Sequence, residues 1–390
     1  MWRRFAVSVL TIAVFATVAS ATAQARVPFG FVGMLPPSTS VYRGLNLNQQ
    51  MATMVASGVE SLRYEIVWAS AQPYSDFSQV PAAQRGQFES VDGVPTTFRA
   101  TDPTVLLAAK HGLRILADVL VTPDWAAATH NPGTYNLPAS NTTYARFLTA
   151  LVQHYGPHGS FWRQHPSVHP VPIRLWQIWN EPNITLYWPD QPFAPGYIRM
   201  LSAAHGAIKR VDPGARIVLA GMPNFMWDDI ESIYKIPGAR KLFDAVAAHP
   251  FTSEAAGVIT ILQRVRAVMN KYGDSHKPLY ATEVSWPSSV GKTSQLFGFE
   301  TTEAGQAQRI SQLLPLLAAN RKPLGLAGFD WSTWVTRDER GDKSFEFAGL
   351  FKYPHRHLIA KPGYRAFRKA ALALEGCRVK ASLAGRCLRH

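Results

Sequence analysis

The stretch WQIWNEPN, residues 176–183, ends a strongly apolar run on a charged side chain. The preceding run, 171–180, has the length and composition of a buried strand. Asn180 and Glu181 follow at the point where the apolar pattern stops. Because a buried strand needs neighbouring strands on both sides, we expect similar apolar runs elsewhere in the chain.

Short apolar runs rich in β-branched residues alternate with helical patterns along the sequence, which predicts β/α repetition and a parallel sheet. The predicted strands are 29–34, 59–68, 112–121, 171–180, 216–221, 242–249, 277–284 and 324–331, and the predicted helices are 46–58, 101–112, 141–156, 195–211, 258–273, 304–320 and 361–376. Eight such units favour an α/β fold with a single (β/α)8 TIM barrel. A glycine-rich fingerprint is absent after the first strand, so we expect neither a dinucleotide-binding fold nor a cofactor.

The first 25 residues have the pattern of an export signal. Arg3 and Arg4 precede the apolar stretch 5–19, and Ala23-Gln24-Ala25 resembles a small-residue cleavage site. We therefore expect a signal peptide at 1–25, a catalytic domain at 26–376, and a secreted protein that is extracellular or associated with the cell wall. An uncleaved anchor is the alternative, and after cleavage no membrane span is expected.

The C-terminus is basic and carries both cysteines. The net charge is +14, and residues 351–390 contribute ten Lys or Arg and one acidic residue. Cys377 and Cys387 predict a disulfide that staples a basic tail at 377–390 in an exported protein. The basic residues favour a solvated helix face, and binding to an acidic cell-wall polymer is the alternative. The rest of the mature chain is nearly neutral, which argues against nucleic-acid binding.

Two glutamates end strands on opposite sides of the predicted barrel. Glu181 follows the fourth strand and Glu283 ends the seventh. Reactive groups in these barrels lie at the C-terminal ends of the strands, so both carboxyl groups are expected at one mouth. Glycoside hydrolysis needs such a pair, one protonated as an acid and the other ionised as a nucleophile or base.

Aromatic side chains accompany these carboxylates. Flat indole faces bind the apolar C–H faces of sugar rings. The tryptophans that we expect to contact a sugar follow predicted strand ends, and they are Trp125, Trp179, Trp286, Trp331 and Trp334. The pattern favours an oligosaccharide or polysaccharide as substrate.

Several motifs resemble those of the clan A retaining glycoside hydrolases, (β/α)8 barrels that include families such as 5 and 39 with cellulases and β-xylosidases. WNEPN at 179–183 resembles their strand-four signature, and TEVSW at 282–286 resembles their strand-seven nucleophile motif. The resemblance extends to LRY at 62–64 with Trp68, TPDWA at 122–126, AGLF at 348–351 and KPGY at 361–364.

The resemblance implies roles for individual residues. Glu181 is expected to be the acid/base and Glu283 the nucleophile, with Arg63 holding the ionised Glu283 and Asn180 bonding the sugar 2-hydroxyl. His249 is expected at the substrate, with a purely structural role as the alternative. Many members have a His-x-Tyr pair after strand six whose tyrosine bonds the nucleophile, but this chain has Phe251, which cannot donate that bond.

The sequence thus predicts an exported O-glycosyl hydrolase that cleaves β-linked sugars by double displacement. The alternatives are a non-hydrolytic protein that binds cell-wall carbohydrate and a transglycosylase on the same barrel. Asp118 is expected to be structural. His355 and His357 form a potential metal pair, but they follow strand eight, so no metal is expected.

Overall fold

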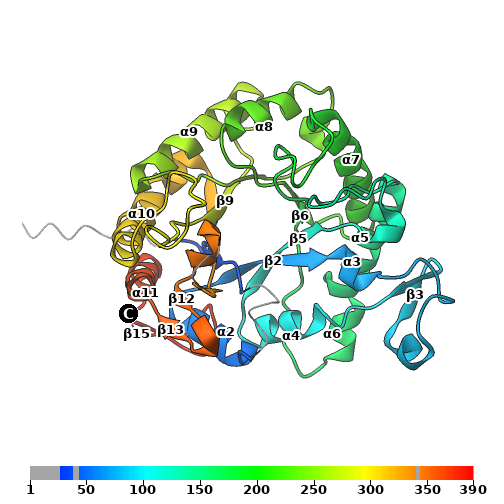
Figure 1. The fold of residues 1–390 in the computed structure, drawn as a ribbon, viewed down its shortest axis with the longest axis horizontal. Coiled ribbons are helices and arrows are strands. Elements are labelled where there is room, and N and C mark those ends of the chain that lie inside the picture. The colour runs from blue at the N-terminus through cyan, green and yellow to red at the C-terminus, as the bar shows by residue number, and fades with distance from the viewer. Residues whose placement is uncertain (1–26, 38–43, 340–342, 390) are drawn as a thin grey trace, which may run out of the picture.

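The computed structural model describes residues 27–37, 44–339 and 343–389, so the predicted export signal lies outside the described residues. Eight parallel strands form the central sheet (Figure 1), and all eight coincide with predicted strands. The strands are β1 (Val32–Met34), β2 (Ser61–Val67), β5 (Arg114–Leu120), β6 (Leu175–Ile178), β7 (Arg216–Leu219), β8 (Val246–Ala248), β9 (Leu279–Val284) and β10 (Leu326–Trp331).

The sheet order is β7-β6-β5-β2-β1-β10-β9-β8. A parallel bridge between Val218 and Ala245 joins its two outer strands. The backbone N–H of Leu219 also donates to the Ala245 carbonyl at 3.0 Å. The sheet therefore nearly closes, which confirms the predicted (β/α)8 barrel.

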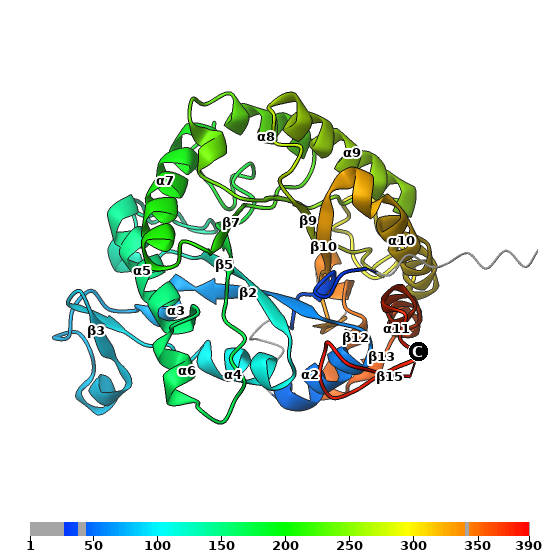
Figure 2. The ribbon, with the colours of Figure 1, turned by 180° about the vertical axis from the view of Figure 1, so that it is seen from behind.

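Helices surround the sheet, as the view from behind also shows (Figure 2). They are α2 (Leu47–Ala56), α3 (Trp68–Ala71), α4 (Asp102–Lys110), α5 (Asn141–Tyr155), α6 (Ser160–Gln164), α7 (Ala194–Val211), α8 (Met226–Tyr234), α9 (Ala255–Lys271), α10 (Glu303–Leu324) and α11 (Pro362–Glu375). The side-chain oxygens of Asn46, Ser140 and Thr302 cap α2, α5 and α10, which fixes where these helices begin. None of the helices in the described ranges is long and apolar enough to cross a membrane.

Apolar packing occurs on both sides of the sheet. The main core lies between the strands and the helices, because alternate strand residues point outward. A small inner cluster of Val218, Ala245 and Ala247, with Leu175 and Tyr280 against it, lies apart from that core. The inward positions of β2, β5 and β6 nearer the mouth are polar and buried, at Arg63, Asp118 and Gln177. The barrel interior is therefore apolar at one end and polar near the mouth, where reactive side chains can meet a substrate.

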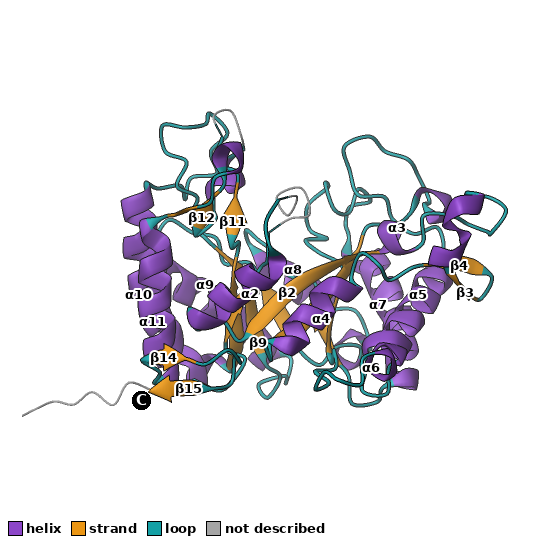
Figure 3. Ribbon diagram, turned by 90° about the horizontal axis from the view of Figure 1, so that it is seen from below, coloured by secondary structure: helices purple, strands orange, loops and turns teal. Residues whose placement is uncertain are grey.

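Shorter elements occupy segments that the sequence predicts as loops. The long segment 69–100 contains a 3-10 turn, η1 (Ala82–Gln87), and a hairpin of β3 (Glu89–Val91) and β4 (Val94–Thr96). Further along, β11 (Val335–Thr336), β12 (Phe351–Lys352) and β13 (Ile359–Ala360) form a small sheet at the mouth (Figure 3). The predicted strands 171–180 and 242–249 are longer than the observed β6 and β8, because apolar content extends past the hydrogen-bonded ladder.

The C-terminal segment packs against the opposite end of the barrel (Figure 3). A disulfide joins Cys377 and Cys387 across the hairpin of β14 (Val379–Lys380) and β15 (Cys387–Arg389), as the sequence predicts. Lys380 is 6 % exposed, and its ammonium contacts Glu60 at 2.9 Å and the carboxylate of Glu375. Lys380 lies on β14, not on a helix, and its charge is paired inside the protein, so the predicted solvated helix face does not describe this part of the basic segment.

We expect Lys380→Met to destabilise the protein by about 3–5 kcal/mol, because it leaves two buried carboxyl groups without their cation. Lys369→Met on the exposed face of α11 is the matched control, with an expected change within about 0.5 kcal/mol. Urea unfolding followed by tryptophan fluorescence measures both. Equal midpoints for the two variants would contradict a structural role for Lys380.

Candidate active site

The chain turns sharply where β6 ends. Trp179 has φ of 69° and Glu181 has φ of 41°, in the left-handed region that side chains with a Cβ rarely adopt. The Trp179 indole N–H donates to the Tyr187 carbonyl at 2.8 Å, and the Glu181 N–H donates to the Gly221 carbonyl at 2.9 Å. These bonds hold the strained backbone so that Asn180 and Glu181 reach the mouth.

Arg63 on β2 is the centre of a buried polar network. Its guanidinium donates to Asp118 at 2.6 Å, to Glu283 at 2.7 Å, to the Asn180 side-chain oxygen at 2.7 Å, and to Gln177 at 3.3 Å. Burial alone would lower the pKa of Arg63, but the Asp118 and Glu283 carboxylates raise it above its ordinary value. The guanidinium therefore stays charged and connects β2, β5, β6 and β9.

Glu283 lies between two donors. Arg63 contacts its Oε1, and the Ser332 hydroxyl donates to its Oε2 at 3.4 Å. The Phe251 side chain has no donor for this carboxylate, and its backbone N–H donates to the His249 carbonyl at 2.8 Å. Ser332, directly after β10, thus supplies a hydroxyl contact to the Glu283 carboxylate from a different strand end than Phe251.

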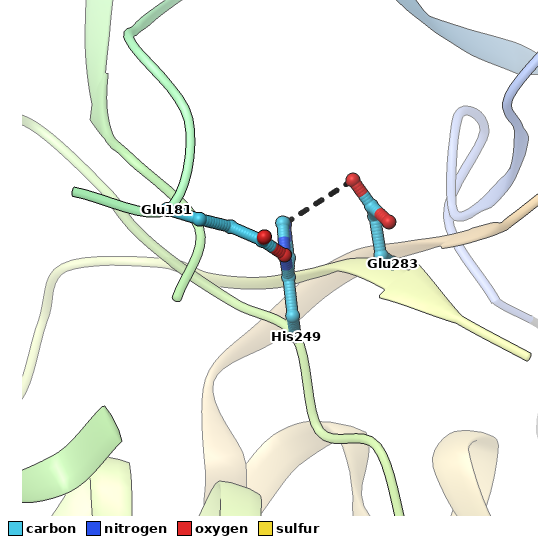
Figure 4. Close-up of side chains that lie close together, drawn as sticks. All are labelled: Glu181, His249 and Glu283. Carbon is cyan, nitrogen blue, oxygen red and sulfur yellow. Dashed lines mark hydrogen bonds and ion pairs between the residues drawn. The ribbon is translucent and has the colours of Figure 1, made fainter. Parts of the chain in front are cut away.

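His249 lies between the two glutamates (Figure 4). Its Nδ1 is 2.7 Å from Glu181 Oε1, and its Nε2 is 3.8 Å from Glu283 Oε1. One oxygen of each glutamate and one nitrogen of His249 all lie within 4.8 Å of one another. The structure thus brings Glu181, Glu283, Arg63, Asn180 and His249 together, as the sequence predicts for site residues.

Burial gives these groups different protonation behaviour. It raises the pKa of the Glu181 carboxyl to about 7, although the Arg63 charge opposes the rise. It lowers the pKa of His249 to about 3, so the imidazole is neutral at neutral pH. It raises the pKa of Asp118 well above its ordinary value, against the lowering effect of Arg63. Glu181 is therefore the carboxyl of the pair that can carry a proton near neutral pH.

A cleft of about 450 Å³ opens above these residues. Its floor includes Glu181 and Glu283, and its walls come from loops that follow several strands. The long segment 69–100 contributes Ser70, Ala71, Thr97 and Ala100 to the cleft wall. A second cavity of about 560 Å³, lined by Gln153, Arg163 and Arg174 among others, contains none of the predicted site residues.

The predicted sugar-binding tryptophans lie mostly in the core. Trp179, Trp286, Trp331 and Trp334 are at most 1 % exposed, and none of them lines the cleft. The indole N–H groups of Trp286, Trp334 and Trp125 donate to Thr252, Gln50 and Gln72. These side chains thus pack and anchor loops in this structure, and their contact with a sugar stays a prediction that this geometry does not support.

Sequence reasoning missed several residues at the site, among them Ser332, Tyr187, Gln177 and Glu65. Gln177 is fully buried and accepts a hydrogen bond from Arg63. Glu65 lines the cleft and is exposed. Glu65 could have been found from strand periodicity, because it lies two residues from Arg63 on β2 and residues at that spacing share a face. Gln177 offered no such signal, because β6 ends at Ile178, before the catalytic glutamate.

The chain matches no family model, and no curated protein matches its sequence. Solved structures, in contrast, resemble it over most of its length. A family 39 glycoside hydrolase from Bacteroides cellulosilyticus WH2 aligns with a TM-score of 0.64 at 16 % identity, covering 90 % of this chain and 65 % of that chain. This chain therefore spans slightly less than two thirds of that protein.

Two further structures extend the comparison. A monomeric β-xylosidase from Caulobacter crescentus CB15 aligns with a TM-score of 0.61 at 17 % identity, covering 87 % of this chain and 67 % of that chain. A GH5_18 protein from Bifidobacterium longum subsp. infantis aligns with a TM-score of 0.60 at 16 % identity, covering 94 % and 85 %. The chain therefore has the (β/α)8 barrel fold of these clan A glycoside hydrolases.

Proposed function

We propose that the protein hydrolyses β-linked O-glycosidic bonds by double displacement. The observation that carries the proposal is the pair Glu181 and Glu283, whose nearest oxygens lie within 4.8 Å at the floor of one cleft. Retaining glycosidases hold their two carboxyl groups about 5–5.5 Å apart, whereas inverting ones leave room for a water at about 6.5–9.5 Å. The short separation supports retention.

Glu181 is the proposed acid/base. The neutral His249 donates its Nδ1–H to Glu181 Oε1, which leaves the other oxygen of Glu181 to carry the proton that reaches the leaving sugar oxygen. Glu283, oriented by Arg63 and Ser332, attacks the anomeric carbon as that bond breaks. Glu181 then takes a proton from water, and the water oxygen displaces Glu283 to release the sugar.

The charge of the cleft restricts the substrate. Among the residues that line the cleft in the described part of the chain, the acidic ones are Glu65, Glu181, Glu283 and Glu346, and the one basic residue is Arg63. Arg63 is already paired with Asp118 and Glu283. A sugar that carries carboxylates would be repelled, so the proposed substrate is a neutral saccharide.

Export is part of the proposal. Disulfides persist in oxidising compartments, so the Cys377–Cys387 bond supports a secreted or cell-wall location. The exposed basic residues near the C-terminus remain a candidate contact with an acidic wall polymer. Export predicts that the culture medium contains a chain that begins near Arg26. N-terminal sequencing of the secreted protein tests this.

Glu181→Gln is expected to lower kcat by roughly 10²–10⁴-fold on substrates with poor leaving groups, because it removes the general acid. Glu283→Gln is expected to lower kcat at least as much on all substrates, because no covalent intermediate forms. Glu89→Gln on the exposed β3 is the matched control and should retain full activity. A panel of aryl β-glycosides and polysaccharides measures all three, and full activity in either active-site variant would reject the assignment.

The pH profile provides an independent test. Since the acid must be protonated and its pKa is about 7, kcat/KM should fall as the pH rises through about 7. The fall should approach tenfold per pH unit above that value. In Glu181→Gln, a dinitrophenyl glycoside, whose leaving group needs no acid, should react without this alkaline fall. An unchanged alkaline limb in the variant would assign the titration to another group.

The stereochemical outcome tests the carboxyl separation. Proton NMR of the first product during hydrolysis of an aryl β-glycoside should detect the β-anomer before mutarotation. Initial appearance of the α-anomer would indicate inversion. Binding of polysaccharide by the unmodified protein without any product would instead favour the non-hydrolytic alternative.

A further inference from the structure

Four phenylalanine rings form a continuous strip that begins beside the catalytic pair and ends in solvent. We call Phe251, Phe345, Phe299 and Phe297 the phenylalanine strip. The Phe251 ring lies 6.1 Å from the His249 ring between centroids, and His249 contacts Glu181. Phe251 stacks on Phe299 at 5.3 Å, and Phe299 stacks on Phe297 at 5.9 Å. Phe345 contacts all three other rings at 5.2–5.7 Å.

The rings come from three separate segments of the chain. Phe251 follows β8, Phe297 and Phe299 lie between β9 and α10, and Phe345 belongs to the 3-10 turn η4 (Ser344–Phe347) after β10. Segments that follow neighbouring parallel strands meet at the same end of the barrel. The strip therefore exists only in the folded protein and lies at the mouth.

Glu300 holds the outer part of the strip in place. Its carboxylate accepts hydrogen bonds from the backbone N–H groups of Phe297 at 2.5 Å and Gly298 at 2.8 Å. The Ser344 hydroxyl donates to the same carboxylate at 2.8 Å, and this bond ties the turn to η4. An exposed aromatic surface that is fixed by a charged anchor is pre-organised for contact with a ligand.

The strip is not ordinary core. Phe251 and Phe345 line the cleft, and Phe297 is 59 % exposed with Leu296 beside it at 56 %. Such apolar area is unfavourable in water, so burial against a ligand would stabilise the bound state. The rings of Phe251, Phe299 and Phe297 are stacked in that order, with 8° and 19° between successive planes, whereas Phe345 is tilted by 45–64° against all three. The stacked rings partly cover one another, so the exposed surface of Phe297 is the part of the strip that can take the C–H face of a sugar ring.

We infer that the phenylalanine strip binds the saccharide units next to the sugar at Glu283, so that the substrate is a neutral oligosaccharide or polysaccharide chain. This inference rests on the proposed glycosidase function. The occupant is a chain because the strip is continuous with the catalytic cleft at one end and open to solvent at the other. Phe251 cannot donate a side-chain hydrogen bond to Glu283, and its ring forms the inner end of this surface.

Binding is tested separately from catalysis in the Glu283→Gln background. Native gels that contain soluble xylan, mannan, galactan, arabinan or mixed-linkage β-glucan measure retardation of the protein. On the polysaccharide that the parent binds best, Phe297→Ala should weaken binding by about tenfold, as the loss of an aromatic contact implies. Phe297→Trp should restore most of it. The control Leu388→Ala, on a side chain 64 % exposed at the opposite end of the barrel, should bind as the parent does.

Kinetics in the otherwise unmodified protein provide the second arm. For Phe297→Ala, the loss in kcat/KM on an oligosaccharide of the cleaved polymer should exceed the loss on an aryl monoglycoside by about tenfold. Equal losses would assign the strip to an apolar aglycone and overturn the inference. Parent-like binding by Phe297→Ala, or no binding of any of these polymers by the parent, would overturn it as well. Hydrolysis that depends on Glu181 and Glu283 would leave the proposed function standing in each of these cases.

Discussion

The buried guanidinium of Arg63 is the interaction on which the site depends. It lies 1 % exposed inside the barrel and donates to acceptors on three other strands or their ends. A buried charge without partners would cost several kcal/mol. The folded state is therefore stable only when Asp118 and Glu283 contact the guanidinium. Because Arg63 also holds the Asn180 oxygen, one side chain orients both glutamate-bearing strand ends. A requirement of folding and a requirement of chemistry thus coincide in one network.

The same network gives the two glutamates different contacts, and with them different protonation. Glu283 contacts Arg63 directly, whereas Glu181 contacts the neutral His249. Burial raises the pKa of Glu181 to about 7, so at neutral pH this carboxyl can give and take a proton. Two carboxyl groups in one cleft therefore have environments suited to different roles, which is the arrangement that acid/base catalysis with a nucleophile needs.

Much of the fold could be predicted from the sequence, because apolar runs and helical periodicity report directly on burial. All eight barrel strands follow from these runs, and Glu181 and Glu283 follow from their positions where predicted strands end. Arg63 lies within β2, and its role follows from the resemblance of its motif. The contacts of His249 and Ser332 could not be predicted, because they join strand ends far apart in the chain. Most of the predicted tryptophans are buried, because a large ring at a strand end is as suited to fixing a loop as to binding sugar. The phenylalanine strip was equally hidden, since its rings come from three loops.

The central claim is that Glu283 forms a covalent bond with the sugar during turnover. Incubation with 2,4-dinitrophenyl 2-deoxy-2-fluoro-β-glycosides of glucose, xylose, galactose and mannose, followed by peptide mass spectrometry, tests it directly. The account predicts one added fluoroglycosyl group on the peptide that contains Glu283, and none in Glu283→Gln. A label on a different residue, or no label from a protein that hydrolyses the corresponding unfluorinated glycoside, would contradict it.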